Sequence, residues 1–305
     1  MDTHSIGIIK REQIAWAKRH GICLLKGSPA TKEEPLYVQR LEQNFFEPLS
    51  PETVREYEQG DGRPLRGKSG GMPHLHATHN SDAIAANVFH YWRMRHPSRV
   101  ACYLDMGTHR PTSPSIHFEK KFRILPSAGT CPNIDVAIRH ENGRCCEWMG
   151  IESKFTETYP AKRQKLFDDK YFGPQVCWCG LGATRKLAEA FRGSGEKFQT
   201  QKTHLDRGQL IKHLLGMRQC YARQSAHAPH LRLVYLWYNV GTEESRKHQQ
   251  EVECFAGVLK EDGVFFQPMT WQELISRIVD GERTNHSAYV EYLKDRYLMT
   301  NAVPT

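Results

Sequence analysis

The dipeptide Asn142-Gly143 interrupts a run of alternating apolar and polar residues that extends over 131–159. Asn-Gly is the strongest short signal for a β-hairpin with a two-residue turn, because both residues accept the positive φ angles of a type I′ turn. Such a turn predicts antiparallel pairing in which Asp135 lies opposite Gly150. No other segment limits the fold as much, since a shift by one residue would exchange the two faces of the hairpin.

Alternation along the two strands predicts one face with three polar groups that can act together. These groups are Asp135, Glu152 and Lys154. The other face is expected to carry Ile134, Val136, Ile138, Ile151, Ser153 and Phe155. Asp135 and Glu152 become diagonal neighbours with backbones about 7–8 Å apart. Gly150 is expected to leave room beside them for an ion or a phosphate.

Two carboxylates this close can bind one divalent cation. Mg2+ prefers oxygen ligands and keeps some waters for a substrate phosphate, and Mn2+ accepts similar ligands. Such an ion polarises a phosphoryl oxygen and lowers the pKa of a bound water. Lys154 is expected to position the attacking water or to stabilise the negative charge of the pentavalent transition state. The alternative interpretation is a ladder of ion pairs on a solvated strand.

At these residues the chain resembles the PD-(D/E)XK nuclease superfamily, which has the restriction-endonuclease-like fold. Pro132-Asn133-Ile134-Asp135 is similar to the "PD" half, with Pro three residues before the acid, and Ile151-Glu152-Ser153-Lys154 matches the "(D/E)XK" half. The resemblance implies that Asp135, Glu152 and the Ser153 backbone carbonyl bind the metal and that Lys154 serves catalysis. Within the superfamily, the chain is most similar to stand-alone bacterial restriction endonucleases.

Two further positions fit this pattern. Glu119 lies on the polar side of the preceding predicted strand, where an additional acid often joins the metal site of these enzymes. Gln209 and His213 are one helical turn apart, and residues 209–213 resemble the Q-x-x-x-Y helix of RecB-like and lambda-exonuclease-like members, with His in place of Tyr. The alternatives are an ordinary strand-face charge for Glu119 and ordinary helix polarity for His213.

Periodicity, caps and turn signals predict the other elements. Helices are expected from Ile9 to Gly21, from Pro35 to Phe45, after Ser50-Pro51, after Asn80-Ser81-Asp82, and around 203–222, 242–260, 271–279 and 287–298. Strands are expected at 100–104, 116–124, 231–240 and 264–267. In the second of these strands, Ile116, Phe118, Phe122 and Ile124 are expected to share a face.

This order predicts an α/β (α+β) chain with the restriction-endonuclease-like αβββαβ core: a central mixed sheet flanked by helices, with a helical N-terminal extension. Residues 1–73 would form that extension and a basic, glycine-rich loop. Residues 74–305 would form the nuclease domain, with a helical elaboration at its C-terminal end.

The charge balance favours a polyanionic partner. Lys and Arg number 42 against 34 Asp and Glu, which gives a net charge of +8. Arg63, Arg66 and Lys68 make the glycine-rich loop a candidate arm for nucleic-acid phosphates, with a solvated linker as the alternative. The resemblance implies DNA as the partner, and a homodimer would suit double-strand cleavage.

No stretch approaches the roughly 20 apolar residues of a membrane helix, and the first residues lack the apolar region of a secretion signal. Nine cysteines, an odd number, favour a reducing cytoplasm over a disulfide framework. The closest cysteines are Cys145-Cys146 and the pair Cys177 and Cys179, which lack the usual C-x2-C spacing of a zinc site. No role is assigned to them.

Together these features predict a Mg2+-dependent deoxyribonuclease that hydrolyses phosphodiester bonds, in defence or DNA processing. An endonuclease is favoured over an exonuclease. A non-catalytic DNA-binding or assembly subunit on the same fold is the first alternative, because fold alone does not establish function. A metal-dependent hydrolase of small phosphoesters is the second.

Overall fold

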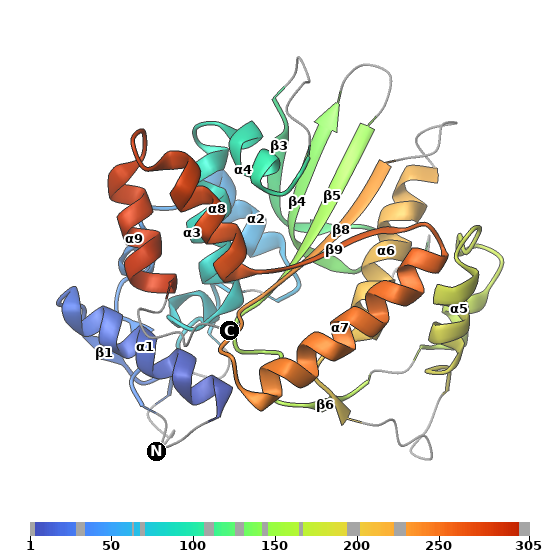
Figure 1. The fold of residues 1–305 in the computed structure, drawn as a ribbon, viewed down its shortest axis with the longest axis horizontal. Helices are drawn as coiled ribbons and strands as arrows, with labels where there is room; N and C mark the ends of the chain where they lie inside the picture. Colours follow the sequence, from blue (N-terminus) through green and yellow to red (C-terminus); the bar gives the residue numbers. More distant parts are fainter. Residues whose placement is uncertain are drawn as a thin grey trace.

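The computed structural model describes residues 4–28, 34–62, 64–67, 71–106, 113–125, 131–141, 146–164, 167–193, 202–222 and 230–298. Within these ranges the chain forms a five-stranded mixed sheet with helices on both faces (Figure 1). This arrangement confirms the predicted α/β architecture. In the described part of the chain, no helix is both long enough and apolar enough to span a membrane.

The sheet carries the predicted αβββαβ core. Its strands lie in the order β3 (Ser115–Lys121), β4 (Asn133–Glu141), β5 (Cys146–Lys154), β8 (His230–Trp237) and β9 (Phe265–Thr270). The first three are antiparallel neighbours, whereas β8 runs parallel to β5 and β9 runs parallel to β8. Helix α3 (Ser81–Arg93) precedes β3, and α6 (Arg207–Ala222) connects the hairpin to β8, as the superfamily resemblance implies.

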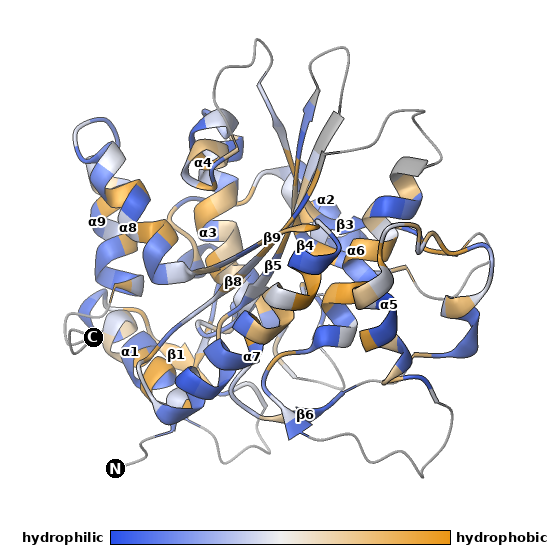
Figure 2. Ribbon diagram, turned by 45° about the vertical axis from the view of Figure 1, so that its right-hand side comes forward, coloured by the Kyte–Doolittle hydropathy of each residue, from blue (hydrophilic) through white to orange (hydrophobic). Residues whose placement is uncertain are grey.

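Helices cover the two faces of the sheet. α3, α8 (Trp271–Glu282) and α9 (Ser287–Tyr297) bury one face, and α6 and α7 (Glu243–Glu261) bury the other (Figure 1). Figure 2 shows α3 mostly in the apolar colour, whereas α7 carries both colours. This contrast fits a helix enclosed between sheet and helices and a helix with one face in solvent. All five C-terminal elements predicted from the sequence, from β8 to α9, are present.

Shorter elements complete the described chain. They are α1 (Ser5–Arg19), β1 (Leu24–Leu25), β2 (Tyr37–Val38), α2 (Pro51–Gln59), α4 (Pro97–Tyr103), β6 (Lys162–Arg163), α5 (Gly182–Glu189) and β7 (Lys202–Thr203), with 3-10 turns η1 (Leu41–Asn44), η2 (His74–His76) and η3 (Asp169–Phe172). α1 contacts α9, where Gln13 Nε2 donates to the Arg296 carbonyl at 3.2 Å. The division at residues 73 and 74 stays a prediction.

Two predicted elements are wrong. The segment from Pro35 to Phe45 is not a helix: it forms β2 and η1, and the buried Asn44 side chain donates to two carbonyls of the η2 region. Residues 100–104 are not a strand, because α4 covers them as far as Tyr103. Pro97 opens α4 at its first turn, and a short apolar run does not distinguish a strand from a buried helical turn.

The β4–β5 hairpin forms, but its register differs from the predicted one by two residues. Ala137, not Asp135, lies opposite Gly150, and Glu141 pairs with Cys146, not with Arg144. The predicted turn residues Asn142 and Gly143 lie outside the described residues. The described pairing ends at Val136 opposite Ile151, and the two acids do not keep the shared face that was predicted for them. Asp135 joins Asp82 of α3, whereas Glu152 contacts His213 of α6 on the other side of the sheet.

The function predicted for Gly150 is also wrong. A Cβ at Gly150 would lie 2.7 Å from the Met217 sulfur and 2.8 Å from Ile134 Cδ1. The missing side chain therefore lets α6 approach the sheet and does not make room for an ion. The short distance to Ile134 Cδ1 shows that the Ile134 side chain lies on the face of Gly150, although Ile134 was predicted on the opposite face.

Alternation along β3 breaks at its centre. Ile116 and Phe118 pack in the cluster that contains α3, as predicted, whereas Phe122 packs with Trp148 on the other face. Ile124 packs with the residues of α6, so it also departs from the predicted face. Glu119 between them has a φ of +52°, which interrupts the extended backbone.

Helix α6 touches the end of β3 at a glycine. A Cβ at Gly216 would lie 2.5 Å from the Phe122 carbonyl oxygen and 3.0 Å from Phe122 Cβ. We expect Gly216→Ala to lower the free energy of unfolding by about 1–2 kcal/mol, because backbone cannot move aside as a side-chain tip can.

The matched control is Gly257→Ala in α7, where a Cβ meets no atom within 4 Å. This change should raise stability by up to about 1 kcal/mol through helix propensity alone. Urea denaturation of both variants measures the difference. Equal stability of the two variants would show that α6 does not depend on this close approach.

Candidate active site

Three carboxylates from three elements meet beside the sheet. They belong to Asp82 in the first turn of α3, Glu119 in β3 and Asp135 in β4, and one oxygen of each lies within 4.8 Å of the others. Glu119 and Asp135 were predicted site residues. Asp82 was considered only for capping its helix. The three form the one potential metal-binding cluster of acids, histidines or cysteines in the described part of the chain.

The start of α3 is tied to the end of β5, and this contact places Asp82. Asn80 caps the helix by accepting the Asp82 N–H at 2.8 Å. Glu157 accepts the Ser81 N–H at 3.3 Å and the Phe155 N–H at 2.8 Å, so one carboxylate joins both elements. Asp82 is consequently held against the strands that carry the other acids.

Asp135 and Glu119 are each fixed by a neighbour. Asp135 Oδ2 accepts the Ser153 N–H at 2.7 Å, which joins the two halves of the predicted motif across the hairpin. Glu119 accepts a hydrogen bond from the Asn133 side chain. A Cβ at Gly60, directly after α2, would collide with the Glu119 carboxylate, so the glycine provides the space that this side chain occupies.

The second half of the motif forms a buried cluster beside the three acids. Lys154 Nζ lies 2.5 Å from Glu152 Oε1 and donates to Gln209 Oε1 at 3.2 Å. His213 Nε2 lies 2.8 Å from Glu152 Oε2. Gln209 and His213 thus face the Glu-x-Lys segment from α6. The Glu152 carboxylate is turned toward these groups and is not a member of the three-acid cluster.

Burial and repulsion from neighbouring carboxylates raise the pKa values of the three acids. Burial, Glu157 and Glu152 raise the pKa of Asp82 to about 7, and burial, Asp82 and Glu152 raise that of Glu119 to about 8. Burial and the Glu152 charge raise the pKa of Asp135 well above its ordinary value. The cluster therefore favours protons or a bound cation at neutral pH.

Glu152 and Lys154 show the opposite behaviour. Burial alone would raise the pKa of Glu152, but Lys154 and His213 outweigh it and lower that pKa to about 2. Burial would lower the pKa of Lys154, but the charges of Glu152 and Asp135 raise it above its ordinary value. This pair is a carboxylate and an ammonium group throughout the neutral range.

A hollow of about 230 Å³ lies beside the cluster. Glu119 forms part of its wall, together with Glu56, Gln59, His117, Phe118, Lys120 and Lys121. These residues come from α2 and β3, on the side of Glu119 away from β4. The hollow gives a ligand a polar space next to one of the three carboxylates.

The remaining predicted contacts lie apart from this arrangement or outside the described residues. Arg66 is exposed, and Arg63 and Lys68 are outside the described part of the glycine-rich loop. Cys177 and Cys179 are free thiols and belong to no metal-binding group among the described residues.

Asp82 is the site residue that sequence reasoning missed. Its signal is an acid in the first turn of the helix that opens the αβββαβ core, directly after an Asn cap. Acids at this position are common because they interact well with the helix dipole. Only the tertiary contact through Glu157 distinguishes Asp82 from an ordinary helix-start acid.

Comparison with curated proteins and with solved structures found no match for this chain. The chain matches the model of the protein family REase-ARP, described as restriction endonuclease associating with ARP, over residues 10–298. The matched range includes every helix and strand of the core and all residues gathered at the site, and it agrees with the resemblance to restriction endonucleases. The protein therefore belongs to the family of restriction endonucleases associating with ARP.

Proposed function

We propose that this protein is a nuclease that hydrolyses phosphodiester bonds of DNA with the help of a divalent cation. The observation that carries the proposal is the convergence of Asp82, Glu119 and Asp135 beside the Glu152–Lys154 pair. Membership of a restriction endonuclease family supports the same proposal.

The donor atoms fit Mg2+ or Mn2+. The cluster offers carboxylate oxygens only, which are the ligands that these hard cations prefer. Burial and repulsion raise the pKa values of Asp82 and Glu119, and a bound cation would offset both effects. We assign Asp82, Glu119 and Asp135 as ligands, with Glu152 and the Ser153 carbonyl as the further ligands that the superfamily resemblance implies. When bound, the ion supplies a Lewis acid and an acidified water.

Lys154 acts in this proposal as a fixed positive charge. Because its pKa is raised, it cannot accept a proton from water at neutral pH. It is instead placed to stabilise negative charge on the attacked phosphate and to orient the water. Gln209 and His213 hold Lys154 and Glu152 in this arrangement through the contacts at 3.2 Å and 2.8 Å.

Cleavage assays test the proposal directly. We expect the pure protein to cut DNA with Mg2+ or Mn2+ and not with EDTA, and to lose cutting by at least about 1,000-fold in Asp135→Asn and Lys154→Met. Closed circular DNA distinguishes endonuclease from exonuclease activity. Salt-sensitive binding of DNA without cleavage under any metal condition would favour the non-catalytic subunit. Cleavage of nucleotides but not polymers would favour the small phosphoester hydrolase.

The Asp135→Asn substitution should stabilise the metal-free fold. Asp135→Asn keeps an oxygen for the Ser153 N–H but removes a repelled carboxylate, so the free energy of unfolding at pH 7 should rise by about 1 kcal/mol or more. Glu152→Gln is the contrast, because it leaves Lys154 and His213 without their carboxylate and should cost roughly 3 kcal/mol. Urea denaturation in EDTA measures both. Loss of stability in Asp135→Asn would contradict the described charge balance.

Stability without metal should fall as pH rises from 6.5 to 8.5. The folded-state pKa values of Asp82 and Glu119, about 7 and about 8, exceed the ordinary values of 3.8 and 4.5. The folded state therefore binds more protons than the unfolded state in this range, and stability is lost as these protons leave. A fall of about 2 kcal/mol is expected.

Added Mg2+ should reverse this trend, because the ion replaces the departing protons. Thermal unfolding in EDTA and in Mg2+ at each pH measures the effect, with Glu119→Gln as the variant in which the slope becomes shallower. Unfolded histidine still binds protons at the lower end of this range, so the buried His79 and His248, whose pKa values burial lowers to about 4 and about 3, oppose the fall by about 0.4 kcal/mol each. A flat profile in EDTA would contradict the raised pKa values.

A further inference from the structure

The backbone of Glu119 is held in an unfavourable conformation. Its φ of +52° is in the left-handed region, where among described non-glycine residues it is accompanied only by Asp105. Such a conformation in a residue with a Cβ persists when the surroundings impose it, and it gathers at functional sites. Here it interrupts the alternation of β3 in the middle of the strand, at the residue whose carboxylate joins Asp82 and Asp135.

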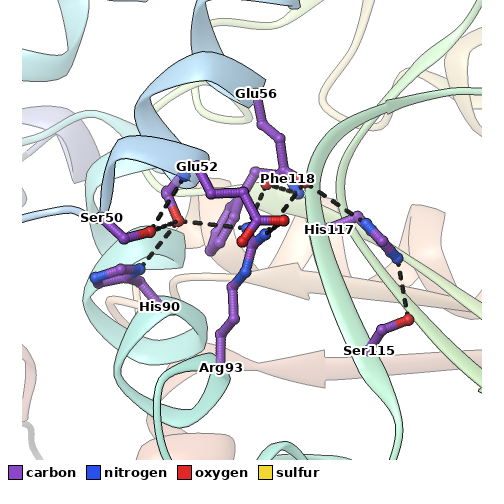
Figure 3. A network of polar contacts seen from close by, with 9 residues as sticks. Ser50, Glu52, Glu56, His90, Arg93, Ser115, His117 and Phe118 are labelled. Carbon is purple, nitrogen blue, oxygen red and sulfur yellow. Dashed lines mark hydrogen bonds and ion pairs between the residues drawn. The ribbon is translucent and has the colours of Figure 1, made fainter.

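A partly buried ion-pair network lies directly before this residue (Figure 3). Glu56 of α2 accepts the backbone N–H of Phe118 at 3.2 Å, on the open edge of the sheet. The same carboxylate lies 3.5 Å from the His117 ring. One side chain of α2 thus contacts the two residues that precede Glu119 in β3.

Arg93 fixes Glu56 in place. It reaches from the end of α3 and forms an ion pair with Glu56, with its own side chain only 9% exposed. Arg93 also lies 2.7 Å from Glu52 and donates to the Thr53 hydroxyl at 3.3 Å. Burial would raise the pKa of Glu56, but His117 and Arg93 lower it overall, so the acceptor stays ionised.

Two further residues, one from β4 and one directly after α2, enclose the Glu119 side chain. Asn133 of β4 donates to its carboxylate, and Gly60 at the end of α2 leaves the space in which that carboxylate lies. α2 therefore contributes twice: Glu56 holds the backbone before Glu119, and Gly60 admits its side chain. Neither contact reaches Asp82 or Asp135, so any effect of Glu56 on the cluster acts through Glu119.

We propose that Glu56, anchored by Arg93, is a positioning residue that holds β3 in the conformation that turns Glu119 into the metal site. The inference rests on the proposed function, because it takes Glu119 as a ligand. It assigns to α2, outside the αβββαβ core, control over the affinity of the site for its cation.

Binding of Mn2+ by calorimetry, without DNA, tests the proposal. Glu56→Met keeps the length of the side chain but cannot accept the Phe118 N–H, and we expect it to bind Mn2+ about 10- to 100-fold more weakly than wild type. Glu56→Gln restores an acceptor oxygen and should recover most of the affinity. Glu52→Gln is the matched control, since Glu52 also pairs with Arg93 but is 63% exposed and does not contact β3 in any described hydrogen bond. It should bind Mn2+ as wild type does.

Hydrogen exchange of the metal-free protein gives a second readout that does not depend on any ion. The Phe118 and Glu119 amides should exchange at least about tenfold faster in Glu56→Met than in wild type or Glu52→Gln. Should Glu56→Met not fold, Glu56→Asp keeps the charge but withdraws it from the Phe118 N–H, and it must show the same losses.

The outcomes separate this inference from the proposed function. Wild type that binds no Mn2+ overturns the metal site, while the exchange experiment still decides whether Glu56 holds β3. Wild type that binds Mn2+, together with a folded Glu56→Met or Glu56→Asp of unchanged affinity, overturns the positioning role. A loss of affinity in Glu52→Gln equal to that in Glu56→Met would also overturn it, because the effect would then come from Arg93 and not from the contact with β3.

Discussion

Burial of three neighbouring carboxylates at the junction of α3, β3 and β4, together with repulsion from nearby acids, is the constraint on which the structure of the site depends. Asp82, Glu119 and Asp135 lie close together at a free-energy cost that their raised pKa values express. A fold does not gather such groups by apolar packing alone. Each is held by directed polar contacts, from the helix cap, from a strand N–H or from a neighbouring amide. Stability and activity should accordingly oppose each other at these residues.

The neighbouring Glu152–Lys154 pair is organised in the opposite way. Its charges compensate each other, and α6 completes the arrangement with Gln209 and His213. The glycines at 150 and 216 bring α6 close enough for these contacts, since a Cβ at either would meet Met217 or Phe122. The site thus combines a repulsive cluster suited to a cation with a fixed ammonium group suited to a phosphate.

Much of this arrangement could be predicted because it depends on strand periodicity. The β4–β5 hairpin was predicted from alternation and a turn signal, but its register is shifted by two residues, and Asp135 and Glu152 lie toward different helices and not on one face. The helices from α6 onward were predicted from strong apolar periodicity. The weak points were short segments: α4 was taken for a strand, and a single Pro35 suggested a helix where tertiary contacts form β2 and η1.

The rest of the site depends on tertiary contacts that no local pattern contains. Asp82 is indistinguishable by sequence from an ordinary acid in a first helical turn, and only Glu157 and the packing of α3 on β5 place it. Glu119 was predicted as a candidate from alternation together with the superfamily resemblance, yet its left-handed backbone breaks that alternation. The contacts around Glu119 and the residue before it come from Glu56, Asn133 and Gly60, which lie in distant parts of the sequence.

Anomalous X-ray diffraction from crystals grown with Mn2+ tests the central claim most directly. The account predicts a manganese peak among the carboxylates of Asp82, Glu119 and Asp135, with their oxygens about 2.1–2.3 Å from the ion. A crystal that shows the three side chains as described, with no peak among them at millimolar Mn2+, would contradict it. A manganese peak at a different group of residues would also contradict it, because the metal site would then not be formed by these three carboxylates.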